Sequence, residues 1–376
     1  METVKDDLIN KKEVRYFNVL KALGIIAVVA GHTGRPAILA TFVYLYHMAL
    51  FFFISGYWYK DYYSQHPILS FWKRIKSIYI SFVVIGALFL SIHNLLFRLH
   101  LYSDKVQPVI DHIYKGREYI GKLKLILTFY NTETMTGAFW FLTSLFEVNI
   151  LFGLISFIIF KVFSKHQESI RFTTVIACFL YGDYLTRHQI FLQRNFNIAL
   201  VAVLIFYFGY LYQKYEEYVK INIFGAISLF AVLCYSMYQG SVHMIINQYS
   251  SLAFFIIVSA AGIYINIYMA KKLIAIDSFG LLQYIGKSSL FILAFHFLSF
   301  KVVYLIQIKL YHLPITVLAK FPVLDSNHGW WILYILCGVF IPTGIKFVFD
   351  KAFLLSKRYL FRTAAILPIF NQTKGN

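Results

Sequence analysis

Fifty consecutive residues, from Ile221 to Ala270, contain no Lys, Arg, Asp or Glu. A helix needs about 20 apolar residues to cross the hydrocarbon core of a bilayer, so this stretch is too long for one crossing. The segment YQGSVHMIINQYS, Tyr238 to Ser250, collects polar residues and glycine midway. It therefore predicts a turn between two transmembrane helices.

The same pattern extends along the whole chain. The chain is 59% hydrophobic and only 14% charged, whereas soluble domains usually contain about 25% charged residues. Ten spans are predicted, near residues 16–34, 42–59, 78–97, 138–160, 172–187, 195–213, 221–239, 250–270, 280–300 and 329–349. We therefore expect an all-α, polytopic membrane bundle in which residues 1–376 form one integral membrane domain with a tail over 351–376.

The distribution of basic residues predicts the orientation. Cytoplasmic loops of membrane proteins are enriched in Lys and Arg, and most of the 35 basic residues fall on one side if the N-terminus is cytoplasmic. Both termini are therefore predicted to be cytoplasmic. Basic loops also attract anionic membrane lipids, which accounts for the net charge of +18 without a nucleic-acid partner. The three cysteines all fall in predicted spans at unrelated spacings, which indicates neither a disulfide framework nor a cysteine metal site.

The segment KALGIIAVVAGH carries an ionisable group at each end of an apolar helix, Lys21 and His32. Eleven residues advance three turns and about 20°, so the two side chains share one face, about 16 Å apart along the axis. A charged lysine at membrane depth usually faces a protein interior or a wet cavity. We interpret the pair as aimed into one cavity. The alternatives are a Lys21 that reaches the lipid head groups and a His32 that only packs at the interface.

Four blocks follow one another over residues 15–350: RYFNVLKALGIIAVVAGH, YHMALFFFISGYWYK, FWFLTSLFEVNI and LLQYIGKSSLFILAFHF. Together they resemble the acyltransferase-3 family of membrane O-acyltransferases, especially its fucose 4-O-acetylase-like branch. The resemblance implies a ten-helix enzyme that transfers an acyl group, usually acetyl from acetyl-CoA, to hydroxyls of surface glycans or their lipid-linked precursors. The family hallmark, a basic residue, ten further residues and a histidine, falls on Lys21 and His32. Asn18 stands where an acidic residue is expected, so no ion pair with Lys21 is expected there. We expect a location in a bacterial plasma membrane.

Acyl transfer to a hydroxyl needs a general base, and His32 is the candidate because imidazole is largely neutral at pH 7. Lys21 is suited to a phosphate of coenzyme A. Glu147 is expected to orient His32 or bind the acceptor, with an interhelical hydrogen bond as the alternative. Further candidates for binding acetyl-CoA are Arg15, Arg74 and Lys287. Candidate contacts to the carbohydrate acceptor are His47, Ser55, Trp140 and His296, of which the two histidines could instead serve helix packing.

A metal site and two other functions are the alternatives to acyl transfer. The twelve histidines form no i, i+4 pair on any span and no HExxH motif, so no metal site is predicted. The main alternative function is a transporter or flippase of a lipid-linked glycan, in which His32 and Glu147 relay protons. A membrane-embedded structural or sensor protein is a further alternative. The sequence predicts neither the acceptor sugar nor the oligomeric state.

Overall fold

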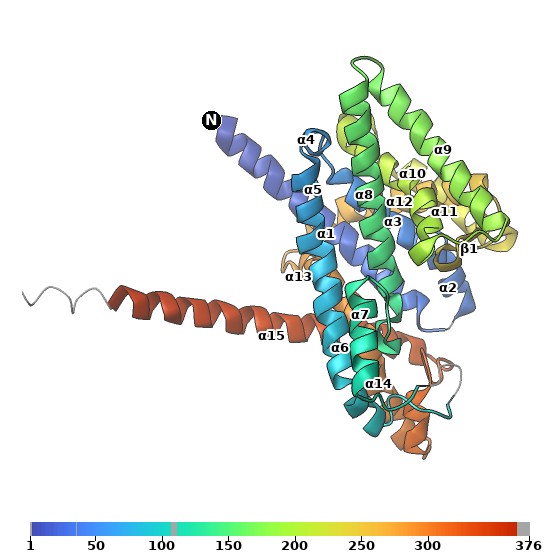
Figure 1. Cartoon of the computed structure of the whole chain (residues 1–376), viewed down its shortest axis with the longest axis vertical. Coiled ribbons are helices and arrows are strands. Elements are labelled where there is room, and N and C mark those ends of the chain that lie inside the picture. Colours follow the sequence, from blue (N-terminus) through green and yellow to red (C-terminus); the bar gives the residue numbers. More distant parts are fainter. Residues whose placement is uncertain (1, 35, 107–110, 367–376) are drawn as a thin grey trace, which may run out of the picture.

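The computed structural model describes residues 2–34, 36–106 and 111–366 (Figure 1). Within these ranges the only strands are β1 (Val242–His243) and β2 (Gln248–Tyr249), which form a short antiparallel hairpin. All other regular elements are helices, which suits a chain in lipid because a helix satisfies its own backbone hydrogen bonds. The chain is therefore the all-α, polytopic membrane bundle that the sequence predicts.

The α-helices are α1 (Glu2–Gly31), α2 (Ala37–Tyr44), α3 (His47–Tyr57), α4 (Tyr62–Gln65), α5 (Pro67–Arg74), α6 (Ile80–Arg98), α7 (Gly116–Leu127), α8 (Trp140–Val162), α9 (Gln167–Arg187), α10 (Phe196–Tyr215), α11 (Ile223–Gln239), α12 (Leu252–Ile276), α13 (Leu281–Lys287), α14 (Ser289–Leu310) and α15 (Trp330–Ile366). A π-helix, η1 (Ile75–Tyr79), joins α5 to α6. The 3-10 helices are η2 (Thr134–Phe139), η3 (Gln193–Asn195), η4 (Glu216–Tyr218), η5 (Met244–Ile246) and η6 (Ile315–Ala319).

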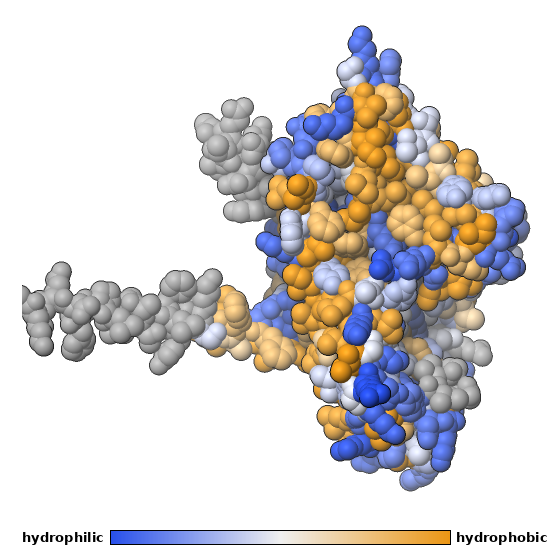
Figure 2. Space-filling model, viewed as in Figure 1, coloured by the Kyte–Doolittle hydropathy of each residue, from blue (hydrophilic) through white to orange (hydrophobic). Residues whose placement is uncertain are grey.

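Eight helical stretches in the described ranges are long and apolar enough to cross a membrane. They are Val14–Gly31, Ala37–Tyr57, Pro67–Arg98, Thr134–Val162, Gln193–Tyr218, Leu252–Ile276, Ser289–Leu310 and Trp330–Ser356. Helix α11 is apolar but shorter, and α9 has 21 residues that include Glu168, Arg171 and Asp183. Helices thus occupy all ten predicted places, and Figure 2 shows their apolar side chains as broad orange areas on the surface.

The ninth predicted span, 280–300, is placed too early in the chain. Helix α13 ends at Lys287, and the membrane-length helix α14 begins only at Ser289. Helix α13 instead packs tightly on α1, since a Cβ atom at Gly286 would overlap the carbonyl oxygen of Asn18. At the C-terminus, α15 continues to Ile366, so the predicted tail begins as helix, and its residues 367–376 lie outside the described ranges.

Segments predicted to share one side of the membrane lie together. Lys214 Nζ, near the end of α10, lies 3.2 Å from Glu168 Oε2 at the start of α9 and 3.9 Å from Asp61 Oδ2 after α3. On the opposite side, Asn247 Nδ2 of the hairpin donates to Thr186 Oγ1 near the end of α9 at 2.7 Å. The free ends of α1 and α15 both project from the left in Figure 1. Below, the inner side is the Lys214 side and the outer side is the Asn247 side.

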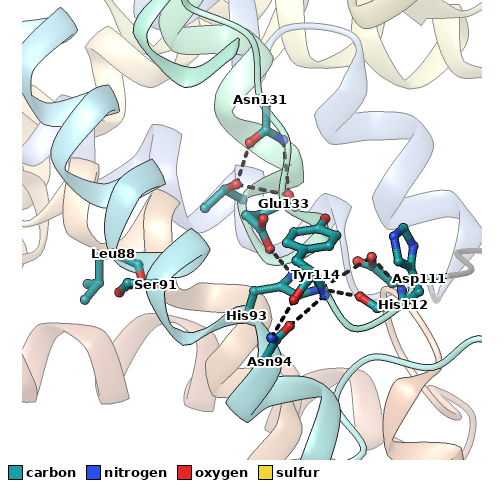
Figure 3. Close-up of polar contacts among 10 residues, drawn as sticks. Leu88, Ser91, His93, Asn94, Asp111, His112, Tyr114, Asn131 and Glu133 are labelled. Atoms are coloured by element: carbon teal, nitrogen blue, oxygen red, sulfur yellow. Dashed lines mark hydrogen bonds and ion pairs between the residues drawn. The ribbon is translucent and has the colours of Figure 1, made fainter. Parts of the chain in front are cut away.

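A buried polar cluster closes the outer end of α6 (Figure 3). The His93 side chain is fully buried, its Nδ1 lies 2.8 Å from Glu133 Oε2, and its Nε2 lies 2.9 Å from the carbonyl oxygen of His112. Because an ionised Glu133 carboxylate and a backbone carbonyl oxygen only accept hydrogen bonds, a ring that donates to both from its two nitrogens carries a positive charge. The Tyr114 ring stacks on it with centroids 3.5 Å apart. The cluster fastens the long loop between α6 and α8, which contains the short helix α7.

Candidate functional site

One face of α1 lines two neighbouring cavities. Lys21, Ile25, Val28 and His32 recur at intervals of three and four residues, which places them on one side of a helix. The first three line a cavity on the inner side, and Val28 and His32 line a second cavity nearer the outer side. The structure thus places both ends of the KALGIIAVVAGH segment on the expected common face, but in two adjoining cavities and not in the one cavity that the sequence predicts.

The cavity on the inner side, called the inner cavity below, has a volume of about 610 Å³ and lies among α1, α3, α5 and α8. Its lining is strongly basic, because it includes four cations and no acidic side chain. The four cations are Lys21, Lys60, Lys73 and Arg74. Such a lining fits an anionic ligand.

Arg74 is the most deeply buried of the four cations. Its side chain is only 9% exposed, and neither Nε nor Nη2 has a hydrogen-bond partner among the described residues. The buried indole N–H of Trp58, in the same lining, also lacks an acceptor in the described ranges. Leaving a buried donor unsatisfied costs about 1–3 kcal/mol, and more for a charged group. These orphaned donors therefore fit a ligand that supplies anionic oxygens.

The other inner-cavity candidates differ in their surroundings. Lys21 is half-buried and belongs to none of the ion pairs that the described residues form. Ser55 also lines this cavity, and its Oγ accepts from Asn149 Nδ2 at 3.0 Å. The π-helix η1 begins directly after Arg74, and such bulges occur frequently at functional sites.

The second cavity, called the histidine chamber below, has a volume of about 370 Å³. Its lining includes His32, His47, His243 and Trp140. The inner cavity and the histidine chamber share three lining residues, Val28, Met48 and Leu293, which we call the neck. The two cavities therefore adjoin at these three side chains.

The end of α1 positions His32 at the chamber. The helix ends at Gly31, and Tyr44 OH at the end of α2 donates to the Gly31 carbonyl oxygen at 3.0 Å. Gly34 then adopts a φ of +73°, which favours glycine and turns the chain toward α2. His32 is thus held where α1, α2 and α14 meet.

A hydrogen bond between two histidines fixes the tautomer of His32. His296 Nδ1 lies 3.1 Å and 3.0 Å from the carbonyl oxygens of Ile292 and Leu293, so this nitrogen carries a proton. In a neutral His296 the Nε2 atom is then an acceptor, and it lies 3.2 Å from His32 Nδ1. His32 Nδ1 must therefore donate, which leaves His32 Nε2 unprotonated. This is the state that a general base requires.

His47 is held in a comparable way. Its Nδ1 lies 2.7 Å from the carbonyl oxygen of Val43, so Nδ1 donates and Nε2 is the free acceptor of the neutral ring. His47 begins α3 and is 3% exposed, in the wall of the histidine chamber. The chamber therefore contains two imidazoles that can each accept a hydroxyl proton or hydrogen bond.

The remaining predicted residues lie outside the two cavity linings. Arg15 is exposed and donates from Nε to Gln283 Oε1 at 3.1 Å, and Lys287 is exposed at the end of α13. Glu147 is buried, and its Oε2 has no hydrogen-bond partner in the described part of the chain. No hydrogen bond joins Glu147 to His32. His296 is fully buried and contacts His32 instead of lining the chamber.

Sequence reasoning did not single out His243, which lies in β1 and lines the histidine chamber. It stands in the polar segment between two spans that was interpreted only as a turn. The sequence signal that indicates His243 is a histidine among several amide side chains in that turn. Among the described residues, no group of three or more His, Cys, Asp or Glu side chains could hold a metal ion.

Comparison with known families gives a match that covers most of the chain. A family model whose description is acyltransferase domain, of the acyltransferase-3 type, matches residues 14–349, which include both cavities and the neck. Neither the curated proteins nor the solved structures contain a match to the chain.

Proposed function

Because the chain belongs to the acyltransferase-3 family and is a multi-pass membrane acyltransferase, we propose that it transfers an acetyl group from acetyl-CoA to a hydroxyl of a carbohydrate. The observation that carries this proposal is the neck. Its three side chains border both a cationic cavity on the inner side and a chamber in which His32 has a free basic nitrogen. Membership in an acyltransferase family favours this function over the transporter alternative.

We assign the inner cavity to acetyl-CoA. The phosphates would contact Arg74, Lys21 and the neighbouring lysines, because guanidinium and ammonium groups are the usual partners of phosphate oxygens. The orphaned donors of Arg74 and Trp58 support this assignment. The pantetheine arm would then follow α1 toward the neck, and the thioester would lie in the histidine chamber. Arg15 and Lys287 do not line the cavity, so they would contact only a part of the donor that extends out of it.

In the chemical step, His32 Nε2 removes the proton of the acceptor hydroxyl as the hydroxyl oxygen bonds to the thioester carbon. The carbonyl oxygen becomes an oxyanion, for which Trp140 is the candidate N–H donor in the chamber lining. The carbon–sulfur bond then breaks. The thiolate takes the proton from His32 Nε2 and leaves as coenzyme A, so the base is regenerated.

His296 is then a positioning residue. It accepts from His32 Nδ1 and so keeps the basic lone pair on Nε2. The same hydrogen bond strengthens when His32 becomes positively charged, which favours the transition state. His47 would accept a hydrogen bond from the acceptor sugar. Glu147 has no contact that gives it a step in this mechanism.

The acceptor would be a cell-surface polysaccharide or its lipid-linked precursor, and the location a bacterial plasma membrane. The histidine chamber lies nearer the outer side, where such glycans are found, and the donor cavity lies on the inner side. This arrangement supports a path in which the acyl group passes through the protein from the inner to the outer side.

The test uses purified full-length protein, ¹⁴C-acetyl-CoA and surface polysaccharide of the source cells deacetylated with mild base. Wild type should release coenzyme A and label the polysaccharide. His32→Ala should lower kcat about 10³-fold, within the usual range for loss of a general base, and Lys21→Ala should raise the KM for acetyl-CoA. His188→Ala, an exposed histidine outside both linings, is the control. Normal transfer by both the His32 and the Lys21 variants would reject the proposal.

A further inference from the structure

A third cavity, called the outer pocket below, lies between the end of α9, the segment leading into α10 and the β1–β2 hairpin. Its volume is about 740 Å³, and Figure 1 shows β1 beside the end of α9. Hydrogen bonds fix its base. Asn247 Nδ2 donates to Thr186 Oγ1 at 2.7 Å, and Tyr249 OH donates to Asn247 Oδ1 at 2.6 Å.

The outer pocket adjoins the histidine chamber. Ile245 of the hairpin lines both spaces. A side pocket of about 230 Å³ makes a second connection, because it shares Asn195 and Ile198 with the outer pocket and Trp140 with the chamber. A chain-like ligand in the outer pocket could therefore place one end beside His32.

The side chains at the rim of the outer pocket are free to bind a ligand. Gln189, Asn195 and Gln248 are exposed, and their amides form no hydrogen bond with other described residues. Each amide offers a donor and an acceptor, which matches a hydroxyl group. Phe191 is 65% exposed in the same lining and offers an aromatic face to the apolar side of a sugar ring. Concave sites with a few convergent polar groups are typical of small-ligand binding.

The charge of the outer pocket is balanced. Its charged side chains are Arg187 and Asp183, whose Nε and Oδ2 atoms lie 2.6 Å apart. The remaining lining side chains are uncharged. The inner cavity, in contrast, has four cations and no acid. The outer pocket therefore fits a neutral polyhydroxylated ligand better than an anionic one.

We infer that the outer pocket is the binding site for the acceptor, a neutral oligosaccharide of which one unit enters the histidine chamber while the neighbouring units fill the pocket. This inference rests on the proposed function and adds the acceptor's site and charge class. The hairpin then has two roles, since His243 and Ile245 border the reacting sugar and Gln248 contacts the units behind it.

The experiment measures acetyl transfer to neutral oligosaccharides prepared from the deacetylated surface polysaccharide. Phe191→Ala and Gln248→Ala should each raise the acceptor KM about tenfold and leave kcat and the KM for acetyl-CoA unchanged. Both side chains are exposed and unbonded, so folding should be unaffected, as the melting temperature will check. The matched controls are Phe224→Ala, which is 80% exposed on α11, and Gln239→Ala at the end of α11. Neither control residue lines the outer pocket.

The outcomes separate the inference from the proposed function. An unchanged acceptor KM in both pocket variants overturns the inference while transfer by wild type upholds the proposed function. A wild type that binds acetyl-CoA but labels no saccharide overturns both. Charge selectivity is tested with the same oligosaccharides oxidised at their primary hydroxyls to carboxylates, used as competitive inhibitors. Their inhibition constant should exceed the KM of the neutral acceptor about tenfold, and equal values would reject a neutral site.

Discussion

Two regions of the molecule bury a positively charged side chain, and they differ in whether the protein supplies hydrogen-bond acceptors for it. At the outer end of α6, His93 has an acceptor at each ring nitrogen, the Glu133 carboxylate and the His112 carbonyl oxygen. In the inner cavity, Arg74 is almost as deeply buried, but two of its nitrogen atoms have no partner in the described ranges. The first charge is compensated within the chain, and the second is not.

This difference separates a structural group from a binding group. Breaking a buried ion pair by removing one partner is strongly destabilising, because the remaining charge is left without compensation. A buried cation that lacks a partner already carries that cost in the free protein, and a bound anion removes it. We therefore expect changes at His93 to affect folding and changes at Arg74 to affect binding of the donor.

The largest effect is expected for Glu133→Gln. This change removes the nearer of two carboxylates beside the buried His93 ring. Because Asp111 Oδ1 remains 3.6 Å from His93 Nε2, roughly 3 kcal/mol of stability, the lower end for a broken buried pair, should be lost. The melting temperature in detergent should fall by about 4 °C. Glu118→Gln is the control, because Glu118 pairs with His112 on the surface. Equal melting temperatures for wild type and Glu133→Gln would show that this pair does not hold the outer loop.

The next effect is expected for Arg74→Gln, and it concerns binding. Loss of charged hydrogen bonds to phosphate, worth about 1.5–3 kcal/mol, should raise the KM for acetyl-CoA about 10- to 100-fold. The free protein should melt at the same temperature or higher, since an uncompensated charge is removed. The protection that acetyl-CoA gives against melting should be lost. Lys76→Gln, an exposed cation two residues away and outside the lining, should behave as wild type. A less stable Arg74→Gln protein with normal donor KM contradicts the assignment.

The helices could be predicted because their cause is local. Long apolar stretches without charged residues, and the turn residues between them, are visible in the sequence itself. Helices occupy all ten predicted places. The break between α13 and α14 could not be predicted, because it accompanies the contact of Gly286 with the Asn18 backbone, far away in the chain.

The candidate site divides in the same way. The common face of Lys21 and His32 follows from helical periodicity alone. The approach of His296 to His32 joins residues 264 positions apart, and the tautomer it imposes depends on two carbonyl oxygens of α14. His243 reaches the chamber only because the hairpin folds over it. These features depend on tertiary packing, which periodicity does not encode.

The pair of His32 and His296 is intermediate between the His93 cluster and the inner cavity. The two rings form a hydrogen bond with each other, but Nε2 of His32 has no partner in that pair. His296→Leu removes the acceptor of His32 Nδ1, and kcat should fall about tenfold, the lower end for loss of a group that orients a functional histidine. His296→Gln keeps an acceptor oxygen and should restore most of the rate. Both KM values should stay unchanged, and the optimum of the pH–rate profile should move only in the leucine variant. Equal rates in the two variants would indicate that His296 only fills space.

The smallest effect is expected at the neck, where the cationic and histidine-lined regions meet. Val28→Ala removes two methyl groups from the shared wall, so a longer acyl chain should pass or fit more easily. A difference of about 1 kcal/mol, the lower end for one methylene in an apolar pocket, would raise the ratio of kcat/KM for butyryl-CoA over acetyl-CoA about fivefold. Val29→Ala is the matched control, because Val29 is equally buried but lines neither cavity. Any loss of protein stability lowers the activity with both donors equally, so it leaves the ratio of the two kcat/KM values unchanged. If Val28→Ala and Val29→Ala give the same ratio, the acyl group does not travel between Val28, Met48 and Leu293, and the two cavities must serve separate ligands.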